Sequence, residues 1–119
     1  MESRVIKLTP AAHKYGNLNI RPCGKDFFPP DAFGGSSKKE GLGKSVILQA
    51  DGIPNLIKTD IPMNTKTGKP HWIFRERKWV KDFVQFHKLE PNDTVTIYRL
   101  DKRTYKVSPD DVVPSIVGG

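Results

Sequence analysis

The polar and apolar positions of the chain alternate in several short stretches, which is typical of half-buried β-strands. Residues 94–100 alternate strictly and are rich in β-branched side chains, and residues 4–8 alternate until Pro10 interrupts the pattern. Short apolar runs bounded by Gly, Pro, Asn or Asp predict further strands. The strands predicted in this way are residues 4–8, 18–20, 45–50, 55–61, 71–75, 94–100 and 104–107.

Helical spacing is clearest in residues 78–89, where apolar and aromatic positions recur at intervals of three and four and form one face. These positions are Trp79, Val80, Phe83, Val84 and His87. A shorter helix is predicted between Pro22 and Phe28, because Pro suits a first helical turn and Pro29-Pro30 ends it. The predicted fold class is mainly β with two short helices. Residues 1–107 form one predicted domain, and residues 108–119 are expected to be a tail or linker.

The charge balance narrows the choice of partners. The chain has 119 residues, with 20 Lys and Arg against 13 Asp and Glu and a net charge of +7. Such a surplus favours a polyanionic partner, and a basic surface without a specific ligand is the alternative. The lone Cys23 excludes an internal disulfide and a cysteine-cluster metal site. Because neither a signal peptide nor a run of about 20 apolar residues is found, we expect a cytoplasmic protein without a membrane partner.

Basic residues gather in two segments, each placed between predicted strands. An exposed loop predicted at residues 11–19 leads on to Arg21, and it brings together His13, Lys14, Asn17, Asn19 and Arg21. The second segment is residues 62–81, and Glu76 is its only acid. Its basic residues are Lys66, Lys69, Arg75, Arg77, Lys78 and Lys81, and His71 and Trp72 lie between them in the sequence. Lys binds phosphates, whereas Arg, Asn and His read base edges in a major groove about 12 Å wide. Two such projections on one side of a small barrel predict a grip on duplex DNA, and solvated charged loops are the alternative.

Two motifs carry a resemblance to a known family. The first runs Ile20-Arg21-Pro22-Cys23-Gly24-Lys25-Asp26-Phe27-Phe28-Pro29, a short helix that ends in Phe-Pro. The second runs from Lys78-Trp79-Val80-Lys81-Asp82-Phe83 through Leu89-Glu90-Pro91-Asn92-Asp93 into an apolar strand. Over residues 4–107 the order of elements resembles the B3 DNA-binding pseudobarrel, found in plant transcription factors and in bacterial restriction endonucleases of the EcoRII and BfiI kinds.

The resemblance implies a seven-stranded open β-barrel whose two arms enter the major groove. An N-terminal arm would lie between the first two strands, with His13 and Asn19 flanking Gly16 and with Arg21 facing the loop. The C-terminal arm would carry Lys66, Thr67, Lys69, His71, Arg75 and Arg77. A Gly-Lys-Pro-His run within residues 65–72 departs from the plant pattern and favours the bacterial branch. We therefore expect the monomeric recognition domain of a type II restriction endonuclease, bound to duplex DNA and covalently linked to a nuclease domain.

Two other functions stay open at this point. A stand-alone transcription regulator would use the same arms. A metal-dependent nuclease would place Asp31 and Glu76 on a divalent metal, with Lys78 assisting the attacking water. Asp31, however, follows two prolines in a predicted loop, and the three histidines lack metal-ligand spacing. We therefore expect this chain to have no catalytic residues, cofactor or metal of its own.

Overall fold

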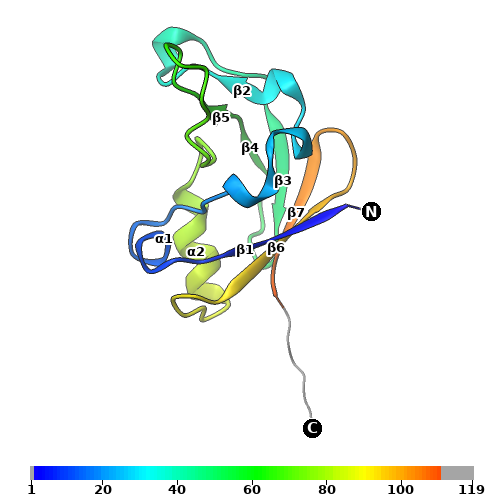
Figure 1. Ribbon diagram of the computed structural model, residues 1–119. Coiled ribbons are helices and arrows are strands. Elements are labelled where there is room, and N and C mark those ends of the chain that lie inside the picture. The colour runs from blue at the N-terminus through cyan, green and yellow to red at the C-terminus, as the bar shows by residue number, and fades with distance from the viewer. Residues whose placement is uncertain (1, 111–119) are drawn as a thin grey trace, which may run out of the picture.

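The computed structural model describes residues 2–110 (Figure 1). The α-helices among these residues are α1 (Pro10–Tyr15) and α2 (Lys78–Phe86). Short 3-10 helices are η1 (Arg21–Cys23), η2 (Lys25–Phe27), η3 (Pro30–Ala32) and η4 (Lys38–Glu40). The strands are β1 (Ser3–Lys7), β2 (Phe33–Gly34), β3 (Val46–Ala50), β4 (Ile57–Thr59), β5 (Ile61–Pro62), β6 (Thr94–Arg99) and β7 (Thr104–Pro109).

Five strands form one sheet, in the order β1-β6-β7-β3-β4. β6 pairs antiparallel with β1 and β7, β3 pairs parallel with β7, and β4 pairs antiparallel with β3. β2 and β5 form a separate short parallel pair. Figure 1 shows this pair at the upper end of the molecule and the two α-helices side by side at the left of the sheet. The protein is thus mainly β, as predicted. Its described part has two α-helices, of which only α2 was predicted as a helix, and the five-stranded sheet is not closed into a barrel.

An aromatic cluster fills the space between the sheet and the short helices. The ring of Phe28 stands edge-on to Phe27 and Phe74, at centroid distances of 5.3 and 5.9 Å. Tyr105 packs against both Phe27 and Phe28, and its hydroxyl donates to the Phe27 carbonyl over 2.8 Å. Burial of a ring of this size stabilises the fold by about 1.5–3 kcal/mol. The cluster therefore anchors the chain between η2 and β2 to the sheet.

The predicted helix at residues 78–89 is confirmed as α2, although it ends at Phe86, three residues earlier than predicted. Its apolar face, which includes Trp79, Val80 and Phe83, is buried, and the Trp79 indole donates to the Glu76 carbonyl over 2.8 Å. Beyond the helix, the Nε2 atom of His87 lies 2.7 Å from the Asp51 carbonyl oxygen. That contact gives the half-buried ring a structural partner.

The prediction of an exposed loop at residues 11–19 is wrong, because the first half of this segment belongs to the helix α1. The Thr9 hydroxyl accepts from the Ala12 amide over 3.1 Å, and Pro10 occupies the first turn, where it loses no hydrogen bond. Gly16 ends the helix in the left-handed conformation at φ 73°. The helix buries only Ala12. It therefore lacks the apolar stripe by which a sequence pattern reveals a helix.

Other boundaries also differ from the prediction. Residues 18–20 and 71–75 are not strands, although they bury Leu18, Ile20 and Phe74. The predicted strand at residues 55–61 is split into β4 and β5 by Asp60, and the predicted first helix is η1 and η2, separated by Gly24 at φ 82°. β7 continues to Pro109, past the boundary predicted at Val107. Residues 111–119 of the predicted tail lie outside the described residues.

Candidate nucleic-acid interface

The two segments predicted to form arms meet along one face of the molecule. The Ile20 amide donates to the Trp72 carbonyl over 2.9 Å, and Arg77 Nη1 donates to Asn17 Oδ1 over 2.6 Å. Residues 17–21 and residues 71–77, called the paired segments below, therefore run beside each other. A shallow cavity of about 300 Å³ between them is lined from both sides, by Asn19 and Arg21 on one and by His71 and Trp72 on the other.

Trp72 has an unusual backbone at this junction. Its φ is 59°, in the left-handed region that a bulky residue rarely adopts. The ring packs edge-on against Phe33 at a centroid distance of 6.5 Å, and the carbonyl accepts the Ile20 hydrogen bond. Strained residues persist only where the surroundings hold them, and they cluster at functional sites. Trp72 is thus the residue that fixes the paired segments to each other and to the body.

A hairpin at residues 63–70 projects above the paired segments (Figure 1). Met63 and Pro70 form an isolated antiparallel bridge, and the Asn64 amide donates to the Lys69 carbonyl over 2.9 Å. The Asn64 side-chain oxygen accepts from the amides of Lys66 and Thr67. The loop is therefore ordered by Asn64 through short local bonds. Its exposed side chains include Lys66, Thr67 and Lys69.

α1 forms a second projection below the paired segments. Lys14 and Tyr15 are exposed at its end, with 61% of Tyr15 accessible to solvent. His13 points the other way, and its Nε2 atom lies 2.9 Å from the Leu89 carbonyl oxygen. A Cβ at Gly16 would lie 3.0 Å from Cγ of Lys81, so that α1 rests closely on α2. His13 therefore ties α1 to the body, whereas Lys14 and Tyr15 extend from it.

Arg75 belongs to a buried network. Its Nε donates to Asp60 Oδ1 over 2.6 Å, and Nη2 donates to Asp60 Oδ2 and to the Gly35 carbonyl over 3.0 and 2.5 Å. The other bond to Oδ2 comes from the Gly43 amide, over 2.7 Å. The side chains of Arg75 and Asp60 are only 19% and 5% exposed. Arg75 thus joins the second paired segment to Gly35 and to Asp60, the residue between β4 and β5, which in turn binds Gly43.

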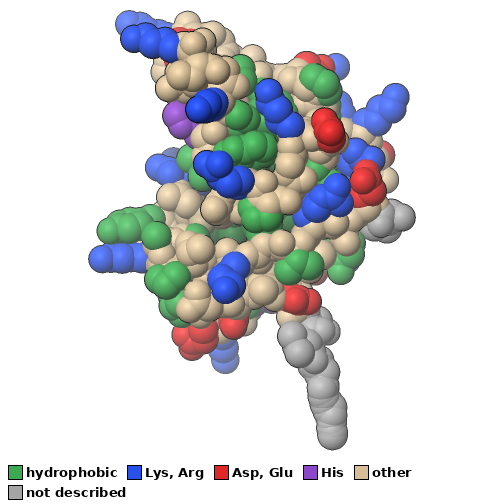
Figure 2. Space-filling model, viewed as in Figure 1, with side chains coloured by type: hydrophobic (Ala, Val, Ile, Leu, Met, Phe, Trp, Pro, Cys, Tyr) green, Lys and Arg blue, Asp and Glu red, His purple; other side chains and the backbone are tan. Residues whose placement is uncertain are grey.

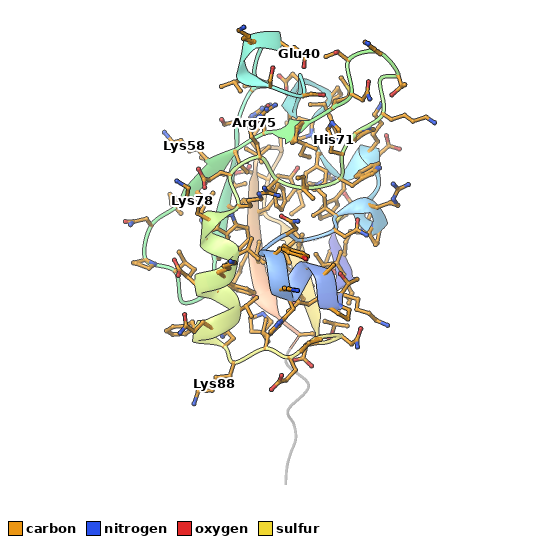
Figure 3. The ribbon with its side chains drawn as sticks, turned by 90° about the vertical axis from the view of Figure 1, so that its left-hand side faces the viewer. Glu40, Lys58, His71, Arg75, Lys78 and Lys88 are labelled. Carbon is orange, nitrogen blue, oxygen red and sulfur yellow. The ribbon has the colours of Figure 1, made fainter. Side chains whose placement is uncertain are left out.

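The exposed charges of this face are mostly basic. Figure 3 looks onto it and shows His71 above α1 and Lys78 at the upper end of α2. The basic residues exposed on these elements are Lys14, Arg21, Lys66, Lys69, Arg77, Lys78 and Lys81. Glu40, beside the hairpin, accepts from the Thr65 hydroxyl over 2.7 Å, and this bond lowers the pKa of its carboxyl group. A surface of this kind attracts phosphates.

The structure adds residues that the sequence reasoning missed. Ser36 Oγ lies 3.2 Å from Nε2 of His71 and donates to the Met63 carbonyl over 2.8 Å, so the Gly-Ser loop supports the hairpin. Tyr15 is the aromatic residue that α1 exposes beside Lys14, whose Nζ lies 5.4 Å from its ring centroid. An aromatic side chain within an otherwise polar segment is the sequence signal that could have identified Tyr15. The contact of Ser36 with His71 spans 35 positions and has no local signal.

The residues considered for a nuclease are dispersed. Asp31 pairs with Arg103 over 2.7 Å, and that hydrogen bond lowers the pKa of its carboxyl group. Glu76 and Lys78 instead line a cavity of about 440 Å³ beside Lys58. Within residues 2–110 no group of three or more His, Cys, Asp or Glu side chains is arranged to hold a metal ion. In the same part of the chain no helix has the length and apolar character needed to cross a membrane.

The chain was also compared with known proteins. No protein family, curated protein or solved structure matches it.

Proposed function

We propose that the chain binds double-stranded DNA sequence-specifically, with the paired segments facing the major groove. The observation that carries the proposal is the pairing of two segments far apart in sequence, each with one exposed arginine, Arg21 or Arg77, through the bonds from Ile20 to Trp72 and from Arg77 to Asn17. The hairpin and α1 extend above and below this strip (Figure 1). A face that is basic, projecting and internally ordered suits a duplex, because little further ordering is needed on binding.

The side chains of this face divide into two proposed roles. Arg77 is held through one guanidinium nitrogen by Asn17, which leaves further N–H groups for the O6 and N7 acceptors of guanine. Arg21, Asn19 and His71 border the same shallow cavity and contact the remaining base edges. The exposed lysines of the hairpin and of α1 bind phosphates and set the register. His13 and Arg75 support the interface from inside rather than touching bases.

We further propose that the fold is a B3-like pseudobarrel. Support comes from the two motifs at residues 20–29 and 78–98, from the seven strands and from the placement of both basic segments on one side. In this proposal the β2–β5 pair completes the wall that the five-stranded sheet leaves open. The Gly-Lys-Pro-His run favours the bacterial branch, so the proposed role is target recognition for a type II restriction endonuclease, with catalysis on a linked nuclease domain.

Selection from a pool of random duplexes tests the proposed binding. The bound fraction is sequenced after several rounds, in the absence of metal. We expect one enriched motif, bound without Mg²⁺ and not cut by this chain. Binding that is equal for the enriched and random duplexes would contradict the proposal, and Mg²⁺-dependent cutting abolished by Glu76→Ala would make the chain a nuclease instead. Cleavage of DNA bearing the enriched motif by the natural full-length protein is the expected result for a restriction enzyme.

A further inference from the structure

A second hollow lies beside the paired segments. It is a cavity of about 370 Å³ lined by Lys25, Asp26, Phe28, Pro30, Phe33 and Met63. Figure 2, in the view of Figure 1, shows apolar side chains gathered in the upper half of the molecule, with basic and acidic side chains around them. The lining combines two aromatic rings with one cation and one anion. That composition is typical of a site for a flat, polar, aromatic ligand.

The walls of this cavity are held in place by the core. The buried Phe28 ring stands edge-on to Phe27, Phe33 and Phe74, at centroid distances of 5.3, 6.5 and 5.9 Å. The Lys25 ammonium lies 5.8 Å from the centroid of the Phe33 ring. Phe28 is only 3% exposed and forms the floor of the cavity, whereas the half-buried Phe33 ring is fixed by these contacts and offers a preformed surface for stacking.

The polar groups of the cavity are available to a ligand. Lys25 and Asp26 are both exposed, and they follow Gly24, whose φ of 82° turns the chain between η1 and η2. Among the hydrogen bonds of the described residues, none involves the Asp26 carboxylate or the Lys25 ammonium. The site thus offers an acceptor and a donor side by side.

The cavity borders the proposed DNA interface. Phe33 packs against Trp72, which lines the shallow cavity between the paired segments. Met63, which also lines the cavity, begins the hairpin. A base that leaves a duplex bound to the paired segments therefore has an adjacent hollow to enter.

We propose that this cavity receives a nucleobase that carries an exocyclic amino group, supplied as an extrahelical base by the bound duplex. The base stacks against the half-buried Phe33 over a floor formed by the edge of Phe28, its amino group donates to the Asp26 carboxylate, and a ring nitrogen or carbonyl oxygen accepts from Lys25. Adenine, cytosine and guanine offer this donor and acceptor pair, whereas thymine has no amino group. The duplex as the source of the base rests on the proposed function, and the nucleobase site does not.

Free nucleosides test the site without a duplex. Cytidine, adenosine, guanosine and thymidine are titrated separately while amide chemical shifts are recorded. We expect shifts at Lys25, Phe28, Phe33 and Met63 with at least one amino-bearing nucleoside and not with thymidine. Asp26→Asn should weaken that binding about tenfold, because the acceptor of the hydrogen bond loses its negative charge and one carboxylate oxygen is replaced by an NH₂ donor. Asp82→Asn, a matched change at an exposed position of α2, should have no effect.

Mismatched duplexes test the source of the base. Each position of the duplex enriched by selection is mismatched in turn, which removes part of the cost of extruding the base there. We expect one mismatch to tighten binding about tenfold in the natural protein and not in Asp26→Asn. If nucleosides bind but no mismatch tightens duplex binding, the bound duplex is not the source of the base. If the protein selects a duplex but neither binds a nucleoside nor binds a mismatched duplex more tightly, the nucleobase site is overturned and the proposed function stands. If it binds a nucleoside but selects no duplex, only the proposed function is overturned.

Discussion

Arg75 and Arg77 are two positions apart and have different surroundings. Arg75 is bonded to the buried Asp60 and to the Gly35 carbonyl, whereas Arg77 is exposed and bonded to Asn17. The sequence could not separate them, because both are arginines in the same basic run and Asp60 is 15 positions away from Arg75. Nothing in the sequence near Arg75 shows that Asp60 is buried or that the two side chains form a pair. The resemblance to B3 domains likewise assigned both arginines to one arm.

Replacing Arg75 by alanine should therefore mainly lower stability, whereas replacing Arg77 should mainly weaken DNA binding. Arg75→Ala leaves Asp60 buried without its cation and should lower the free energy of unfolding by about 3–5 kcal/mol. Arg77→Ala should change it by less than about 0.5 kcal/mol and weaken binding to the enriched duplex by about 1–3 kcal/mol. Urea denaturation and fluorescence anisotropy measure the two quantities. Similar losses of stability in both variants would show that the assignment of Arg75 to the interior is wrong.

The single cysteine gives a second prediction at this scale. Cys23 is buried, and burial raises the pKa of its thiol to about 12, a rise that the nearby Arg4 partly offsets. Because only the thiolate is nucleophilic, the native protein should react very slowly with a disulfide reagent at pH 8, and urea-unfolded protein should react fast. Absorbance of the released thiol follows the reaction. Rapid labelling of the native protein would contradict this description of the core.

Among the helices and strands, those strands that pair within the five-stranded sheet were predicted well from alternating or apolar sequence patterns. Strands at residues 4–8, 45–50, 94–100 and 104–107 are confirmed as β1, β3, β6 and β7, apart from shifts at their ends. The strands predicted at residues 18–20 and 71–75 are wrong, because these segments have no partner strand in the sheet. Leu18, Ile20 and Phe74 are buried by packing, but their backbones do not join a ladder. Burial alone produces the same apolar signal as a strand.

The helix α1 was missed because its stability depends on its ends. Thr9→Ala removes the side-chain oxygen that accepts from the Ala12 amide and should lower the free energy of unfolding by about 1 kcal/mol. Thr9→Ser keeps an oxygen at that position and is the matched control. Denaturant unfolding of the three proteins gives the comparison. If serine and alanine have the same effect, the hydrogen bond at the start of α1 contributes little.

At the scale of the whole molecule, the net charge of +7 predicts a polyanionic partner, and the fold adds where the charge is presented. Composition could not place the hairpin above α1, because that arrangement follows from contacts between residues distant in sequence, such as Ile20 with Trp72. The structure turns two basic runs into one surface. In the proposed function the lysines contact phosphates and Arg77 contacts a base. These two kinds of contact should differ in how strongly they depend on the salt concentration.

Salt dependence distinguishes phosphate contacts from base contacts. The logarithm of the binding constant should fall linearly with the logarithm of the salt concentration, because bound phosphates release counterions. Lys66→Ala should reduce the magnitude of this slope by about one and weaken enriched and random duplexes alike. Lys102→Ala, in the turn between β6 and β7, is the matched control and should leave the slope unchanged. Equal slopes for Lys66→Ala and the unaltered protein would remove the hairpin from the interface.

Amide chemical-shift mapping with the duplex enriched by selection shows which residues contact DNA. We expect the largest shifts to fall together on residues 14–21 and 66–77, with small shifts on β3, on β4 and in the turn between β6 and β7. Shifts confined to one of the two paired segments, or centred on the edge formed by β4, would contradict the claim that both segments form one DNA-binding face.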